Sequence, residues 1–103
     1  MSGYNEAHGD TAAVALAIAN DREASEHFQS VLDKHTRWDG KQWQGISPAA
    51  AELEASAKPW QGRIGEIKDA DFTKVSWTEI VASELQERNI EAGRNQYAGL
   101  AAR

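Results

Sequence analysis

Residues 75–88 have the sequence VSWTEIVASELQER and carry the clearest helix-start signal in the chain. Ser76 followed three residues later by Glu79 is a capping box, in which each side chain can satisfy a free backbone amide of the first turn. Val75 before the cap and Ile80 after it can form a hydrophobic staple. Apolar residues then recur at helical spacing on one face, at Trp77, Ile80, Val81 and Leu85. The stretch therefore predicts an amphipathic helix that runs to at least its last residue.

Two further helices are predicted upstream. Residues 11–19 are rich in alanine and almost wholly apolar, and Asp10 stands where its side chain can cap the first turn. Because a short helix that is apolar on all sides belongs in the interior, we expect this helix at the centre of the fold. Residues 22–34 place apolar side chains at helical spacing and acidic ones elsewhere, which is typical of an amphipathic helix.

The middle of the chain changes character. Residues 38–45 contain two tryptophans and two glycines, a composition typical of a turn. Ser47 can then cap a helix that has Pro48 at its first position, where no amide donor is needed. This helix should end near Ala57, because Pro59 disfavours helical geometry in the residue before it.

These segments predict an all-α protein, a compact bundle of four to five short helices. No stretch shows the sustained alternation of β-branched residues that marks a strand. A chain of 103 residues supports one small domain, so we expect a single helical domain over residues 1–103. Residues 1–9 and 93–103 are expected to be loosely ordered, the second stretch being held weakly through Tyr97 and Leu100.

Composition excludes several classes of protein. The chain has no cysteine, which rules out disulfides, thiolate nucleophiles and cysteine-bound metals. The longest apolar run, residues 12–19, is far shorter than the roughly 20 residues that cross a bilayer. Residues 1–10 contain no lysine or arginine, unlike the basic start of a secretory signal. We therefore expect a cytoplasmic protein that does not contact a membrane.

No pattern in the sequence indicates catalysis. The Gly-x-Ser-x-Gly elbow and the P-loop are absent, and Ser47 and Ser76 are explained as helix caps. Glu23 and His27 lie one helical turn apart, as metal ligands do in di-iron bundles, but such a site needs two of these motifs and further carboxylates. An exposed ion pair is the alternative for these two residues. We predict no enzyme activity, no catalytic residue, no metal and no cofactor.

The tryptophans and the acidic residues point to a partner. Trp38 and Trp43 lie in a glycine-rich segment where full burial is hard to arrange, so we expect both to be partly exposed and to anchor a protein partner. Glu23, Glu26 and Asp33 are expected on the solvent face of their helix, as an acidic surface for the same partner. These five are the predicted partner-binding residues.

A nucleic-acid-associated regulator is the alternative. Trp38, Trp43 and Trp60 share residues 37–74 with several lysines and arginines, and exposed tryptophans can stack on bases. The chain carries 16 acidic residues against 11 lysines and arginines, however, and a net charge of −5 repels phosphate. The charge therefore favours a protein partner over direct contact with nucleic acid.

Three stretches resemble small accessory proteins of phages and plasmids: YNEAHGDT at residues 4–11, ALAIAND at residues 15–21 followed by Phe28, and VSWTEIV at residues 75–81. The resemblance implies mobile-element cargo that blocks a host defence complex, as anti-CRISPR and antirestriction proteins do. It transfers no site residue. The expected function is a non-catalytic inhibitor that acts by steric occlusion of a host protein or ribonucleoprotein complex.

A second resemblance involves the centre of the chain. Trp43-Gln44-Gly45 resembles the central turn of the WXG100 secreted helical hairpins, which are chains of similar length. That resemblance implies a secreted helical protein. The family's tyrosine-x-x-x-acid export signal is not matched at Tyr97, which is followed four residues later by Ala101.

Overall fold

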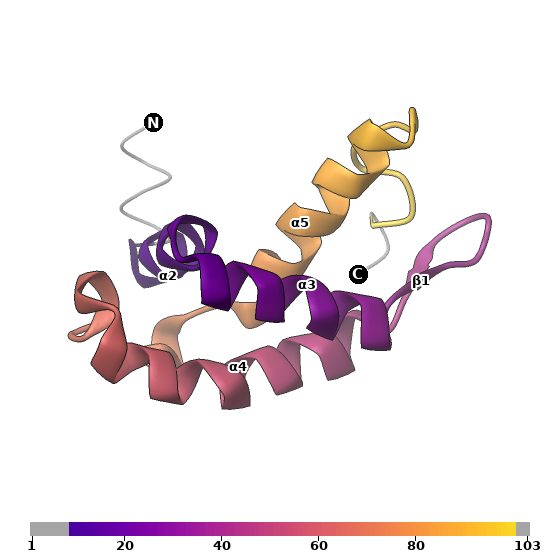
Figure 1. The fold of residues 1–103 in the computed structure, drawn as a ribbon. Helices are drawn as coiled ribbons and strands as arrows, with labels where there is room; N and C mark the ends of the chain where they lie inside the picture. Colours follow the sequence, from indigo (N-terminus) through magenta and orange to yellow (C-terminus); the bar gives the residue numbers. More distant parts are fainter. Residues whose placement is uncertain (1–8, 101–103) are drawn as a thin grey trace.

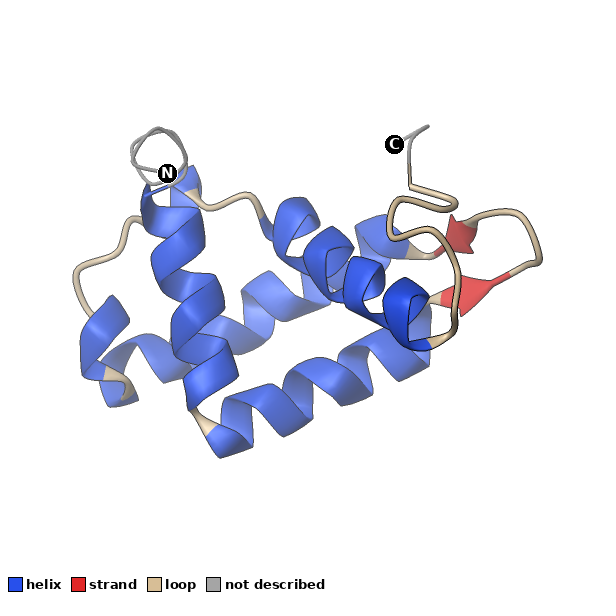
Figure 2. Cartoon of the chain, turned by 90° about the horizontal axis from the view of Figure 1, so that it is seen from above, coloured by secondary structure: helices blue, strands red, loops and turns tan. Residues whose placement is uncertain are grey.

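The computed structural model describes residues 9–100. In this range the chain forms four α-helices, two short strands and two 3-10 turns (Figure 1, Figure 2). The helices are α2 (Gly9–Asn20), α3 (Arg22–His35), α4 (Ile46–Arg63) and α5 (Trp77–Glu91), the strands are β1 (Arg37–Trp38) and β2 (Trp43–Gln44), and the 3-10 turns are η1 (Gly65–Ile67) and η2 (Phe72–Lys74). The predicted all-α bundle is confirmed, with one small hairpin added. None of the helices in this range combines the length and the hydrophobicity that a bilayer crossing requires.

A single residue, Asp21, joins α2 to α3. Its amide donates to the Ala17 carbonyl oxygen at 3.1 Å and ends α2, while its Oδ1 accepts from the Ala24 amide at 2.9 Å and caps α3. α4 packs against both α3 and α5, and α2 packs against α3, α5 and η1. Both ribbon views place the hairpin at one end of the molecule and α2 with η1 at the other (Figure 1, Figure 2).

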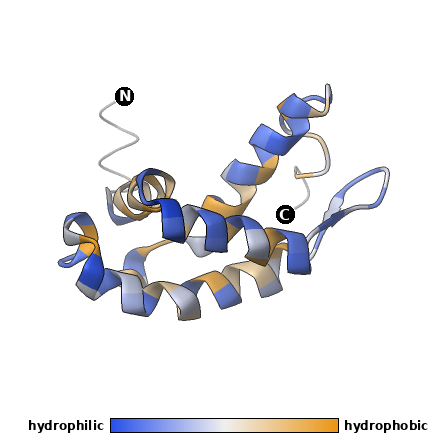
Figure 3. Cartoon of the chain, viewed as in Figure 1, coloured by the Kyte–Doolittle hydropathy of each residue, from blue (hydrophilic) through white to orange (hydrophobic). Residues whose placement is uncertain are grey.

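The core lies between the helices. The four residues predicted to close it are all buried: Trp77, Ile80, Val81 and Leu85. They pack in one cluster with Val14 and Ile18 of α2, so this helix contributes to the core. Its predicted central place is wrong, because α2 lies at the end of the molecule opposite the hairpin and α4 makes the more extensive contacts with α3 and α5 (Figure 1). Burial on all sides of α2 was the wrong expectation, because Leu16 is 63% exposed. Figure 3 shows α2 as a mainly apolar ribbon and the hairpin loop as hydrophilic. Leu16 thus leaves one large apolar side chain of α2 in contact with solvent.

At α5 the Ser76 half of the predicted capping box is confirmed, whereas the Ser76 amide is bonded to α2, and the predicted cap of α2 is wrong. Ser76 Oγ accepts from the Glu79 amide at 3.3 Å, and the Ser76 amide donates to Thr11 Oγ1 at 2.8 Å. Asp10 lies inside α2, and its Oδ2 accepts from the Asp71 amide at 3.3 Å. Thr11 and Asp10 therefore both tie α2 to the chain that leads into α5. Residues 1–9 were predicted to be loosely ordered. Residues 1–8 lie outside the described part of the chain, and Gly9 belongs to α2.

α4 extends beyond both of its predicted ends. Its N-cap is Gly45, which has no side chain to accept a hydrogen bond, so Ser47 lies inside the first turn instead of capping it. Pro59 also lies inside the helix, which continues for another turn. The helix continues because Trp60 is buried in the core and the Ile64 amide closes the last turn on the Trp60 carbonyl oxygen at 2.7 Å. This burial outweighs the hydrogen bond that proline cannot donate.

Leu53→Ala is expected to lower the free energy of unfolding by about 2–5 kcal/mol, because Leu53 is fully buried and its truncation leaves a cavity. Leu16→Ala removes the same atoms from an exposed side chain and should change that free energy by less than about 0.5 kcal/mol. Urea denaturation followed by circular dichroism measures both values. Equal losses would contradict the assignment of Leu53 to the core and Leu16 to the surface.

Candidate partner-binding surface

The segment predicted to be a turn is a short β-hairpin. β1 and β2 pair antiparallel, and Trp38 lies directly opposite Trp43. The two indole rings meet edge to face, with centroids 5.7 Å apart and an interplanar angle of 62°. Both side chains are half-buried, which confirms the expectation that they are partly exposed. The hairpin thus presents the two rings as one aromatic unit.

The Asp39 carboxylate holds the hairpin loop. Its Oδ1 accepts from the amides of Lys41 and Gln42, both at 2.8 Å, and its Oδ2 accepts from Gln44 Nε2 at 2.8 Å. These bonds favour the charged form and lower the pKa of Asp39 from 3.8 to about 2, with the Gln42 amide contributing most. The loop is therefore closed around an ionised carboxylate at neutral pH.

Arg94 covers the aromatic pair from the turn that follows α5. Its guanidinium carbon lies 4.2 Å from the Trp38 ring centroid and 5.7 Å from that of Trp43. Tyr97, on the same turn, is 58% exposed. Tryptophan, tyrosine and arginine are the residue types most enriched at binding hot spots. We refer to Trp38, Trp43, Arg94 and Tyr97 as the hairpin-end surface.

A fully buried asparagine on α5 fixes this arrangement. Asn89 Oδ1 accepts from Trp43 Nε1 and from Arg94 Nε, both at 3.0 Å. Its Nδ2 donates to the carbonyl oxygens of Gln96 and Ala98, both at 3.0 Å. The amide thereby uses two acceptor and two donor positions, which is its full hydrogen-bonding capacity. Neither Asn89 nor Arg94 was predicted from the sequence as part of the site.

Residues 93–100 dock on the hairpin. The Gly99 carbonyl oxygen accepts from the Trp43 amide at 3.3 Å, and any side chain in place of Gly99 would collide with the hairpin. Leu100 is buried in the core cluster, as one of the two predicted anchors. The expected loose order is therefore wrong for this range, whereas residues 101–103 lie outside the described part of the chain.

The predicted acidic residues of α3 are exposed, but each one faces an arginine. The ion pairs are Glu23–Arg63 at 3.8 Å, Glu26–Arg22 at 3.2 Å and Asp33–Arg88 at 3.1 Å. The side chains of the three acids are at least 70% exposed, so solvent screens these pairs and each contributes little to stability. α3 therefore presents alternating charges instead of a uniformly acidic surface.

The structure brings together only part of the predicted site. Trp38 and Trp43 are in contact, and Asp33 lies near the end of α3 from which the hairpin follows. Glu23 and Glu26 lie in the first turns of α3, at the far end of that helix. At 1.5 Å per residue, Glu23 and Asp33 are about 15 Å apart along the helix axis. The structure thus brings the two tryptophans together and spreads the three acids along α3, with Asp33 nearest to the hairpin.

The His27 side chain contacts residues of α4 and does not pair with Glu23. Its Nε2 lies 2.9 Å from Ser56 Oγ, and its ring packs edge to face on Trp60 with centroids 5.7 Å apart. The ion pair weighed for Glu23 and His27 is therefore replaced by a contact between helices. Within the described residues, no three histidine, aspartate or glutamate side chains come together as a group that could hold a metal ion.

The fold and surface define a small helical domain with a rigid aromatic surface at one end. Comparison with protein-family models, with curated proteins and with solved structures gives no match to this chain. The interpretation of the hairpin-end surface therefore depends on its own residues.

Asn89→Ala is expected to lower the free energy of unfolding by about 1–3 kcal/mol, because it leaves the Trp43 indole and two carbonyl groups without their partner. Asn95→Ala is the matched control, since Asn95 is exposed and its side chain accepts from the Tyr97 amide of the neighbouring turn. Urea denaturation monitored by tryptophan fluorescence gives both values. If the two variants lose the same stability, Asn89 does not have the proposed structural role.

The stability of the hairpin loop should depend on pH through the ionisation of Asp39. Because the pKa of this carboxyl is lowered to about 2 by folding, its stabilising effect is present above its ordinary pKa of 3.8 and is lost as pH falls from 3.8 through about 2. The amide chemical shifts of Lys41 and Gln42 in ¹H–¹⁵N spectra should change with pH, with a midpoint at the Asp39 pKa of about 2. Asp39→Ala should abolish the dependence. A midpoint near 3.8 in the native protein would contradict the hydrogen-bonded loop.

Proposed function

We propose that this protein is a non-catalytic binding protein whose hairpin-end surface docks on a partner protein. The observation that carries the proposal is the fixed aromatic pair, because Trp38 and Trp43 pack on each other and are held by Asn89 and Arg94. Side chains that are already held in one geometry lose little conformational entropy on binding. Their partial exposure leaves apolar area that a partner can bury.

The size of the protein is compatible with such an interface. A standard protein interface takes about 800 Å² from each partner. The accessible surface of this protein is 6208 Å², so an interface of that size would cover about an eighth of it. The hairpin, the turn after α5 and the adjoining end of α3 are neighbouring segments that can supply this area.

We further propose that the partner is a bacterial defence complex in the cytoplasm of a host cell. The support is the resemblance of residues 4–11, 15–21 and 75–81 to accessory proteins of phages and plasmids. A domain of this size acts on a larger complex by covering a surface that the complex needs. The mechanism would therefore be steric occlusion, with one protein bound at each blocked site.

Expression of the protein in a bacterium with an active CRISPR or restriction system should raise the plating efficiency of a targeted phage. Trp38→Ala should reduce the affinity for the purified defence complex about thirtyfold or more and should reduce this protection, since truncation of an aromatic hot-spot residue costs about 2 kcal/mol or more. Lys58→Ala, which changes an exposed residue of α4, should leave both values unchanged.

Circular dichroism shows whether Trp38→Ala keeps its helices, so that a loss of binding can be assigned to the surface. A Trp38→Phe variant should retain part of the affinity, because phenylalanine preserves an aromatic contact. Full protection by Trp38→Ala would contradict the proposal, as would the absence of protection by the native protein in every system tested.

A nucleic-acid-associated regulator is the second candidate, because two exposed cations lie on the hairpin with the aromatic pair. These are Arg37 in β1 and Lys41 in the loop. A gel-shift assay with labelled DNA and RNA tests this candidate. Binding that falls steeply with salt and is lost in Arg37→Ala would favour it over the protein partner.

A further inference from the structure

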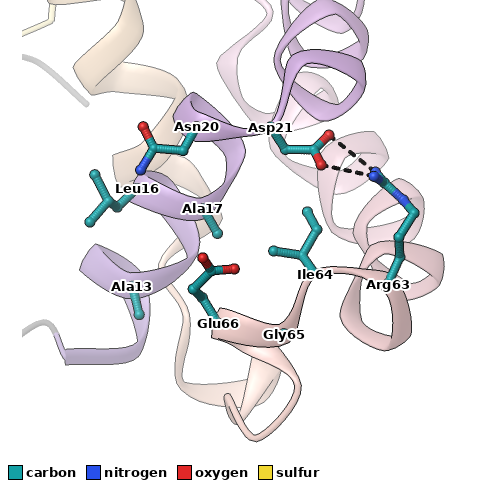
Figure 4. Close-up of a pocket in the computed structure, with 9 residues that line it drawn as sticks. All are labelled: Ala13, Leu16, Ala17, Asn20, Asp21, Arg63, Ile64, Gly65 and Glu66. Atoms are coloured by element: carbon teal, nitrogen blue, oxygen red, sulfur yellow. Dashed lines mark hydrogen bonds and ion pairs between the residues drawn. The ribbon is translucent and has the colours of Figure 1, made fainter.

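A surface groove of about 450 Å³ lies between α2, the end of α4 and η1 (Figure 4). This is the opposite end of the molecule from the hairpin (Figure 1). Apolar side chains line it, namely Ala13, Leu16 and Ala17 from α2 and Ile64 after α4. Among the described residues, Leu16 is the most exposed of the large apolar side chains. The groove therefore keeps aliphatic surface in water, which association would bury.

The rim of the groove has an excess of negative charge. Arg63 donates to both carboxylate oxygens of Asp21, at 2.8 and 3.2 Å, as the dashed lines in Figure 4 show. The bonds from Arg63 lower the pKa of Asp21, and Glu23 lies 3.8 Å from the same guanidinium. Glu66 of η1 is exposed and has no ion-pair partner among residues 9–100. Arg63 thus pairs with two acidic residues, and the negative charge of Glu66 is not compensated by an ion pair within this range.

The end of α2 contributes a polar side chain to the groove. Asn20, its last residue, lines the groove. The last turn of α2 contains no basic residue, but the N-terminus of α3, which has the opposite partial charge, begins after a single intervening residue. The negative charge of the rim therefore comes from the carboxylates. A cation placed beside Glu66 would meet its carboxylate at the edge of the groove (Figure 4).

We propose that this groove is a second docking site, for a short amphipathic helix of a partner protein that carries a lysine or arginine one turn from an aliphatic residue. The aliphatic side chain would pack on Leu16 and Ala13, and the cation would lie beside Glu66. The proposal goes beyond the hairpin-end surface, because the two surfaces share no residue.

The charges argue against two other occupants. A second copy of the chain carries a net charge of −5, and docking groove to groove would bring the Glu66 and Glu23 carboxylates of both copies together. The phosphates of a nucleic acid would meet the same repulsion. A basic amphipathic helix is the occupant that matches both the aliphatic lining and the acidic rim.

Two labelled synthetic peptides test the proposal with the full-length protein. The basic probe is a helical peptide with a leucine stripe flanked by lysines, and the matched probe has every lysine replaced by glutamate. Fluorescence anisotropy should show binding of the basic probe alone, with an affinity that falls as salt rises. The ¹H–¹⁵N spectra should place the shift changes at Leu16, Gly65 and Glu66.

Leu16→Ser and Glu66→Lys should each weaken binding of the basic probe about tenfold or more. Both positions are exposed, so the fold should survive, and circular dichroism verifies this. Ile90→Ser is the matched control, because Ile90 is a half-exposed aliphatic residue of α5 outside the groove. Trp38→Ala removes the hairpin-end surface and should leave peptide binding intact, which separates this test from that of the proposed function.

Four results would overturn the proposal. They are equal binding of the acidic probe, no binding of the basic probe, an equal loss in Ile90→Ser, and shift changes that map elsewhere. A dimer detected by sedimentation, with concentration-dependent shifts at Leu16 and Glu66, would assign the groove to a second copy of the chain instead.

Discussion

The buried amide of Asn89 is the interaction on which the hairpin end depends. A hairpin with two residues in each strand is marginal on its own, and the turn after α5 has no regular secondary structure to hold it. Asn89 joins both segments to α5 through Trp43, Arg94 and two carbonyl groups. A buried amide with every position satisfied orients its partners, whereas a partly satisfied one is costly. The aromatic pair therefore has a defined position because one α5 side chain is in place.

The helices were predicted best where their signals are local. The start of α5 follows from Ser76 and Glu79, three residues apart, and the contact between them is confirmed. The end of α4 could not be predicted in this way, since Pro59 is a local stop signal and the burial of Trp60 is a tertiary effect. Gly45 shows the same limit, because the contact that requires glycine is made with the distant His35 carbonyl.

The candidate surface was predicted only in part, for the same physical reason. Partial exposure of the tryptophans follows from the composition of their own segment. Asn89 lies one turn after Leu85 on the buried face of α5, so its burial could have been expected, but its bond to Trp43 spans 46 residues. The prediction of an acidic surface on α3 failed for the same reason. Two of the arginines that pair with its acidic residues, Arg63 and Arg88, come from α4 and α5.

The connection between α2 and α3 has a consequence for how this chain can vary. Asp21 is at once the end of one helix, the cap of the next and the partner of Arg63. A linker of one residue cannot absorb a change in length. An insertion or deletion there would therefore rotate α2 by about 100° about its axis and move its core residues out of register. The loop around Gly40, by contrast, lies at an exposed tip that can change length without disturbing any helix. Related chains should therefore keep the helix pair at constant spacing and differ in size at the hairpin.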